Sequence, residues 1–193
     1  LLVAIIVVIA FLSVFHIEYK EYNRGAVYLG YFLTPATVCL AIPLYKQLEL
    51  LRQHLIAVAS AIVAGVAGSV GSIYVMCRFF QLEHTHYVTL LPKSITTAIG
   101  MGVSEEAGGI VTLTVISIII TGILGNIIAD WLFQIFKIEE PIAKGLALGT
   151  AAHAIGTAKA LELGEIEGAM SSLSIAVAGL LTVVVVPLMS GLI

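Results

Sequence analysis

The feature that most constrains this chain is a series of long apolar runs that few charged residues interrupt. Hydrophobic residues fill 60% of the 193 positions and charged residues only 11%, and the mean hydropathy is +1.09. A soluble domain would carry about 25% charged residues and could not hide so much apolar surface. The chain is therefore predicted to be an all-α polytopic membrane protein that lies in a lipid bilayer. The net charge is -3, with no basic stripe, so no nucleic-acid partner is expected.

Five runs are long enough to cross the bilayer, because a crossing needs roughly 17 to 25 mostly apolar residues. They cover residues 1–17, 26–45, 55–80, 108–136 and 168–193. Residues 87–104 and 141–161 are also apolar but carry Pro, Gly, Lys and hydroxyl residues, so they are predicted to be broken or re-entrant helices. Such segments persist in a bilayer only where their freed backbone groups face protein or a watery cavity. They therefore indicate the functional core.

The prediction is thus a single domain over residues 1–193 with about seven membrane segments. Because the first residue already stands in an apolar run, one further segment is expected upstream of it.

An internal repeat is also predicted, since residues 31–80 align without gaps with residues 88–137. The alignment pairs Pro35 with Pro92, Gly65 with Gly122, and Gly68 with Gly125. Transporters built from such repeats bind their substrate near the bilayer midplane, between interrupted segments. Whether the two repeats are parallel or inverted stays open.

The densest polar cluster in an apolar setting follows Pro92 and contains Lys93, Ser94, Thr96 and Thr97. A proline in the first turn of a helix loses no hydrogen bond, so the stretch is predicted to begin a helix at this point. Backbone N–H groups, hydroxyls and an ammonium would then converge on one place, as an anion site requires. The alternative is that Lys93 reaches to the membrane interface while the hydroxyls bond their own helix.

A second cluster, residues 145–158, consists of small residues around one imidazole, that of His153. An ionisable group within a membrane segment is a functional candidate, so His153 is predicted to bind substrate or to carry a coupling proton. His153 and Thr157 are expected to face the anion site of Lys93 from this second segment, and Ser171 to cap the last helix or to line the pathway. The alternative for His153 is a structural hydrogen bond to a neighbouring helix.

Glu162 and Glu167 lie between two segments of the predicted core and are further candidates for proton coupling. The simpler alternative for both is a solvated loop. Asp130 stands beside Trp131 near a helix end and is interpreted as an interfacial anchor. No catalytic constellation, metal-ligand spacing or cofactor motif is present, so neither an enzyme nor a bound cofactor is expected.

The two clusters resemble the LrgB/CidB family. The resemblance rests on Leu-Leu-Pro-Lys-Ser-Ile-Thr-Thr at 90–97, His-Ala-Ile-Gly-Thr-Ala at 153–158, Glu-Gly-Ala-Met-Ser-Ser-Leu at 167–173 and Ala-Ile-Pro-Leu-Tyr at 41–45. It runs along essentially the whole chain. The sequence departs from the family pattern at Ala98, where proline is usual, and at Ala152, where serine is usual.

This resemblance implies two functional descriptions. Bacterial members are described as holin-like or antiholin-like modulators of murein hydrolase activity and cell lysis, with a small holin-like membrane protein of the LrgA/CidA type as partner. Plastid relatives translocate glycolate and glycerate, and some bacterial members are linked to pyruvate uptake. We expect a homodimeric transporter of small 2-hydroxy or 2-oxo monocarboxylates, with proton coupling, in a bacterial cytoplasmic membrane rather than a plastid envelope. The alternatives are lysis control without transport, or a purely structural scaffold.

Overall fold

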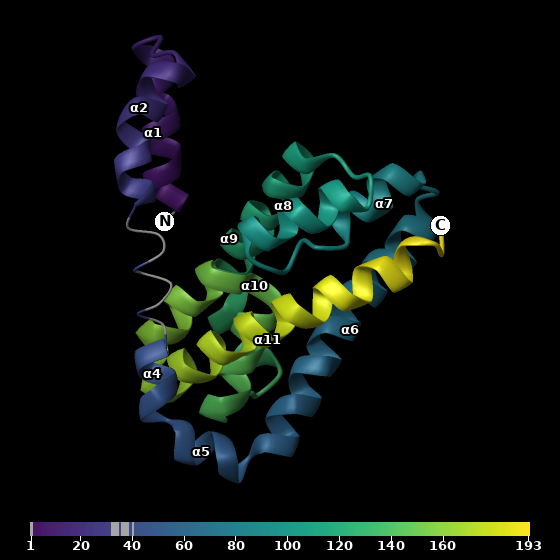
Figure 1. Ribbon diagram of the computed structural model, residues 1–193. Coiled ribbons are helices and arrows are strands. Elements are labelled where there is room, and N and C mark those ends of the chain that lie inside the picture. Colours follow the sequence, from purple (N-terminus) through teal and green to yellow (C-terminus); the bar gives the residue numbers. More distant parts are fainter. Residues whose placement is uncertain (1, 32–34, 36–38, 40) are drawn as a thin grey trace. The chain divides into compact units, whose positions relative to one another are not determined.

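The computed structural model describes the chain apart from residues 1, 32–34, 36–38 and 40 (Figure 1). The described residues form helices joined by short turns, and none of them lies in a strand. This confirms the predicted all-α class. The helices group into two compact units, Leu1–Ile42 and Pro43–Ile193. The assignment of a single domain stays a prediction.

The described residues of the first unit form α1 (Leu2–Val14) and α2 (Tyr19–Gly30), and α4 (Ala41–Lys46) begins at its end. The α2 helix starts between the crossings predicted at 1–17 and 26–45, and it ends inside the second of them. Glu21 in its first turn favours this start, because a carboxylate there complements the helix dipole. Part of the 26–45 prediction lies outside the described residues, so its full extent is not tested.

The second unit contains the long helices. Its elements are α5 (Leu48–Gln53), α6 (Leu55–Phe79), α7 (His84–Leu90), α8 (Thr97–Glu106), α9 (Val111–Ile135), α10 (Pro141–Leu163) and α11 (Glu165–Ser190). Within the described part of the chain, α6, α9 and α11 are the helices long and apolar enough to span a membrane. They match the crossings predicted at 55–80, 108–136 and 168–193. The total of seven segments is not confirmed and stays a prediction.

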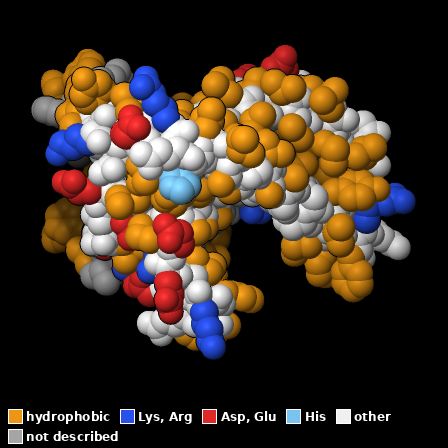
Figure 2. Space-filling view, turned by 90° about the horizontal axis from the view of Figure 1, so that it is seen from below, with side chains coloured by type: hydrophobic (Ala, Val, Ile, Leu, Met, Phe, Trp, Pro, Cys, Tyr) orange, Lys and Arg blue, Asp and Glu red, His pale blue; other side chains and the backbone are white. Residues whose placement is uncertain are grey.

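Apolar side chains cover much of the surface in Figure 2, as expected for a protein surrounded by lipid. On α9 they recur at helical spacing, with Ile116, Ile120 and Ile127 each about half exposed. A soluble helix would bury such a stripe against a core. The outer face of α9 is therefore suited to contact acyl chains.

The α10 helix is the centre of the second unit and packs against α11, α9 and α6. Glycines allow these close approaches. A side chain at Gly145 would collide with the backbone of Glu167, and one at Gly149 would collide with Ser171 and Ser174. Small residues at such contacts are how helices pack closely where lipid supplies no hydrophobic drive.

Both predicted interruptions are present. The α7 and α8 helices are separated by an irregular turn at residues 91–96. The α10 helix is kinked at Ala152 and His153, whose φ/ψ angles of -127°/16° and 42°/-137° are not helical. The backbone groups freed at both breaks lie in the second unit, where neighbouring helices cover them.

The predicted internal repeat is not confirmed. The α6 and α9 helices have equal lengths of 25 residues and occupy equivalent places in the alignment. Their paired glycines also make similar packing contacts, because Gly65 lies against Thr150 and Gly122 lies against His153, both on α10. However, the stretch that would match α7 and α8 falls partly outside the described residues, so the duplication stays a prediction.

Candidate functional site

The site that the structure offers is a half-open cavity of about 640 Å³ lined by α6, α9, α10 and the turn at 91–96. Polar side chains line one end of it: Ser69, Lys93, Ser94, Thr121 and Thr150. Apolar residues line the remainder, which reaches Leu132 and Phe133 near the end of α9. The cavity therefore has a polar end and an apolar end.

The polar end lies near the middle of the helices that could span the membrane. Ser69 is close to the centre of α6 (Leu55–Phe79), and Thr121 is close to the centre of α9 (Val111–Ile135). From Thr121 to Phe133 the helix rises by about 18 Å, at 1.5 Å per residue. The cavity thus runs from mid-depth toward one surface, and mid-depth is where transporters place their substrate.

Lys93 and Ser94 form the polar centre of the cavity. The Lys93 ammonium donates to the Ser94 hydroxyl at 3.1 Å, and the Ser94 and Ser69 hydroxyls share a hydrogen bond of 2.9 Å. The ion pairs found among the described residues do not include Lys93. A half-buried cation beside two hydroxyls is chemically suited to hold a small anion such as a carboxylate.

The prediction of a proline-started helix at this point is wrong. The α8 helix begins at Thr97, and Pro92 lies in the preceding turn. The Lys93 N–H donates to the carbonyl of Leu90 at 3.1 Å within that turn, so it is not a free helix terminus. The Ser94 hydroxyl is also bonded to Ser69 of α6. An anion here would meet the side-chain donors of Lys93, Ser94 and Ser69.

Thr96 and Thr97 lie outside this cavity. Both are half-buried at the start of α8, and neither belongs to the cavity lining. Thr96 is the N-cap residue of α8, yet its side chain makes no capping bond. Of the four residues predicted for the anion site, the structure brings Lys93 and Ser94 to the cavity and leaves the two threonines beside it.

His153 occupies the break in α10, with only 4% of its surface exposed. Its Nε2 lies 2.9 Å from the Ile118 carbonyl of α9. Because a carbonyl only accepts, Nε2 is the nitrogen that carries the hydrogen. The ring also packs on Gly122, where any Cβ would collide with it. The φ angle of 42° is costly for a residue other than glycine, so these contacts hold a strained backbone in place.

Thr157 and Ser171 lie beside His153 in a second buried cluster. The Thr157 hydroxyl donates to the His153 carbonyl at 3.1 Å and shares a 2.7 Å hydrogen bond with the Ser171 hydroxyl of α11. None of these three residues lines the cavity, whereas Thr150 and Ala152, just before the break, do. The break in α10 therefore lies between the cavity, which Thr150 lines, and the buried cluster of His153, Thr157 and Ser171. Thr150 and His153 are less than one helical turn apart.

The two acidic candidates for proton coupling differ in their distance from this cluster, because Glu167 lies one turn before Ser171 on α11 and Glu162 lies near the end of α10. Glu162 has 72% of its side chain exposed and stands 4.0 Å from Lys159. Glu167 is half-buried in the first turn of α11, where a carboxylate complements the helix dipole.

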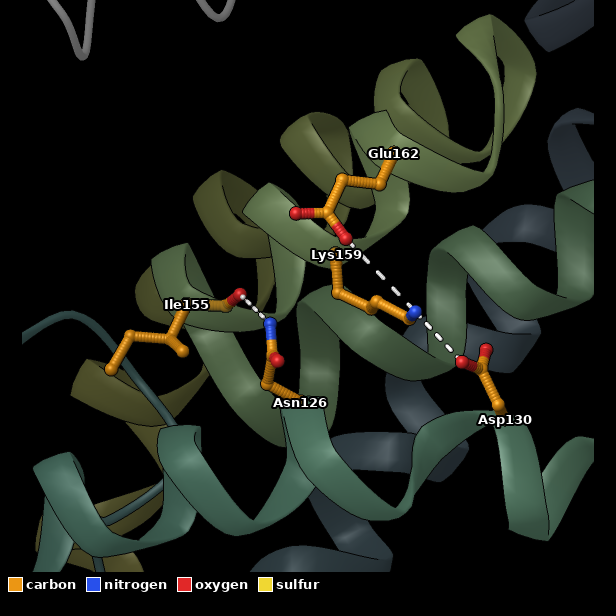
Figure 3. A network of polar contacts seen from close by, with 5 residues as sticks. All are labelled: Asn126, Asp130, Ile155, Lys159 and Glu162. Atoms are coloured by element: carbon orange, nitrogen blue, oxygen red, sulfur yellow. Dashed lines mark hydrogen bonds and ion pairs between the residues drawn. The ribbon is translucent and has the colours of Figure 1, made fainter. Parts of the chain in front are cut away.

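A ladder of polar contacts joins the second half of α10 to α9 (Figure 3). The Asn126 amide donates to the Ile155 carbonyl at 3.2 Å, and the Lys159 ammonium lies 2.7 Å from the Asp130 carboxylate. The Lys159 side chain is only 18% exposed, whereas that of Asp130 is 52% exposed. Asp130, interpreted as an interfacial anchor, thus also forms the shorter of the two ion pairs of Lys159.

Lys159, Ser69 and Thr121 are not among the residues predicted from the sequence, and Thr150 is not singled out within the cluster 145–158. Lys159 had a usable signal, because it lies between apolar and small residues and needs a counter-ion. The three hydroxyl residues had none, since serine and threonine are common in membrane helices and often bond their own backbone.

The fold and this site define a class: a helical membrane protein whose interrupted helices line a cavity at mid-depth. The model of the LrgB-like family matches residues 1–192, so the chain belongs to that family, as the resemblance predicts. Relatives from Bacillus mycoides (strain KBAB4), Bacillus cereus (strain B4264) and Bacillus anthracis (strain CDC 684 / NRRL 3495) are each 40% identical over 188 residues. These matches cover 97% of this chain and 82% of each relative. No solved structure matches the chain.

All three relatives carry the name "Antiholin-like protein LrgB". These names favour the antiholin-like alternative over the transport function that the sequence analysis placed first. They name neither a carboxylate nor a homodimer, so both stay predictions.

The strained break leads to a first prediction. In a regular helix, glycine is less stabilising than alanine by about 0.5 to 1 kcal/mol. At position 153 the order is expected to reverse, with His153→Gly more stable than His153→Ala by about 1 kcal/mol, because only glycine tolerates a φ of 42°. Thermal unfolding of the purified variants in detergent measures the order. A more stable alanine variant would mean that α10 is not broken at this residue.

The ladder leads to a second prediction. Asp130→Asn is expected to lower the unfolding free energy by about 1 kcal/mol, because it leaves the mostly buried Lys159 without its counter-ion, and the exposure of Asp130 limits the cost. Adding Lys159→Met should restore most of the loss. Glu162→Gln is the matched control and should change little. Equal destabilisation by the Glu162 and Asp130 variants would contradict the assignment of the pair.

Proposed function

We propose that this chain is an antiholin-like membrane protein that restrains murein hydrolase activity and cell lysis, and that it acts in a bacterial cytoplasmic membrane. The observation that carries the proposal is the 40% identity over 97% of the chain to relatives of that name. Three helices suited to span a membrane support the location. A small holin-like membrane protein of the LrgA/CidA type is the proposed partner.

Expression in a bacterial strain that lacks its own family member tests this function. Autolysis should slow severalfold, and murein hydrolase activity in zymograms should fall, when the chain and the holin-like partner are produced together. The control is the same strain producing an unrelated membrane protein at an equal level. Unchanged lysis at matched expression would contradict the proposal.

We propose as a second candidate function the transport of small 2-hydroxy or 2-oxo monocarboxylates, such as glycolate, glycerate or pyruvate. The observation that favours it is the cavity whose polar end holds Lys93 and Ser94 near the middle of α6 and α9. A carboxylate would replace the Ser94 hydroxyl as the partner of the ammonium and would accept hydrogen bonds from Ser94 and Ser69. A monocarboxylate of this size needs only part of the available 640 Å³.

The two interrupted segments supply the moving parts of this mechanism. The turn at 91–96 carries the proposed binding groups, and the break at His153 divides α10 into two halves. Both halves pack on α11, the first through Gly149 and the second through Thr157. The first half also contacts α6 at Gly65, and the second half is tied to α9 by Lys159. Alternating access would rock one half against the other. His153 is the proposed coupling residue, because it is the buried one of the three candidates.

Uptake of labelled pyruvate, glycolate and glycerate into proteoliposomes, with and without a pH gradient, tests this second function. Saturable uptake should fall at least tenfold in Lys93→Ala, because the cation is lost, and should partly survive in Lys93→Arg. Lys46→Ala is the matched control, since Lys46 lies exposed in a weak ion pair at 3.8 Å. Absence of uptake by the wild-type chain, or equal loss in Lys46→Ala, would contradict the proposal. Mass measurement in detergent would check the predicted homodimer.

A further inference from the structure

A second cavity, of about 460 Å³, lies where α9 ends and α10 begins. Its charged lining consists of Asp130, Lys137, Glu139 and Lys144. Three of these four residues stand at or beyond the last turn of α9 or in the first turn of α10, so this cavity faces the membrane surface. We name it the outer cavity and the one that contains Lys93 the inner cavity.

Phe133 is the residue that lines both cavities. Its neighbours on α9 divide between them, because Ala129 and Leu132 line the inner cavity while Asp130 and Gln134 line the outer one. On α10, Ala143 and Leu146 line the inner cavity and Lys144 lines the outer one. The half-buried Phe133 ring therefore stands at the boundary between the charged surface cavity and the apolar end of the inner cavity.

The electrostatics of the outer cavity suit an anion. Lys159 pairs with Asp130 at 2.7 Å, which neutralises one of the two carboxylates of the lining. Lys137 and Lys144 then face Glu139 alone within the lining. Glu162 stands 4.0 Å from Lys159 but is 72% exposed, so solvent screens its charge.

We propose that Phe133 is the barrier between the two cavities, and that a small carboxylate enters the inner cavity from the outer one past its ring. The path rests on the second proposed function, transport. The Lys144 ammonium lies 6.0 Å from the centre of the Phe133 ring, within range of a cation–π contact that holds the ring in place. A carboxylate bound by Lys144 would weaken that contact and release the ring. Binding of the anion to Lys144 thus makes its own passage past Phe133 into the inner cavity easier.

The barrier can be tested without measuring transport. Thr121 lines the polar end of the inner cavity, so Thr121→Cys places a thiol behind the barrier. The native cysteines Cys39 and Cys77 are first replaced by serine and alanine. The reaction with a charged, membrane-impermeant methanethiosulfonate reagent, present on both sides of proteoliposomes, reports access from water. Phe133→Ala should raise the labelling rate at least tenfold, and Phe133→Leu should raise it less.

Phe136→Ala is the matched control, because Phe136 is a neighbouring exposed phenylalanine that lines neither cavity. Lys144→Met removes the cation–π contact but leaves the Phe133 ring in place. This variant should raise the labelling rate by an intermediate factor. Unchanged labelling in both Phe133 variants, or an equal rise in Phe136→Ala, would overturn the barrier. Faster labelling in the Phe133 variants supports the barrier, whether or not wild-type vesicles take up carboxylate. Absence of carboxylate uptake would contradict the proposed transport function and not the barrier.

Discussion

The break in α10 is the constraint on which the rest of the second unit depends. His153 stands there at a φ of 42°, and its ring bonds to the Ile118 carbonyl of α9. In a bilayer core no water replaces a lost helical hydrogen bond, so a break survives only where neighbouring chain covers it. The Thr157 hydroxyl donates to the His153 carbonyl within α10, and the His153 ring ties the break to α9 through the Ile118 carbonyl. His153 thus both breaks the helix and holds the break against its neighbour.

The glycines around α10 follow from this break. Gly65 on α6 and Gly122 and Gly125 on α9 leave room for Thr150, His153 and Ala152, which are the residues at or just before the kink. Bulkier residues would push α6 and α9 away and expose the freed backbone to lipid. The same close approach sets the walls of the inner cavity, because Gly65 and Gly125 line it. Packing and cavity are therefore two results of one arrangement of small residues.

Sequence reasoning could predict the helical class, the three long crossings and the positions of both interruptions, because hydropathy and proline, glycine and lysine content are local signals. It could not predict the hydrogen bond between Ser94 and Ser69, because these residues lie far apart in the chain. It also grouped His153 with Lys93, although His153 turns toward Ile118 and not into the cavity. The direction of a side chain at a kink depends on backbone angles that composition does not encode.

The inner cavity bears on the choice between the two functions. A lysine near the centre of a bilayer costs about 2.5 to 3.5 kcal/mol on insertion scales, and the reason to retain one is usually a bound partner. Lys159 has such a partner in Asp130, whereas the contact found for Lys93 is a neutral hydroxyl. A protein that only blocked a holin-like partner through its lipid-facing helices would need neither Lys93 nor the cavity. The two functions are compatible if the state of this cavity, empty or holding an anion, sets the conformation that the partner meets.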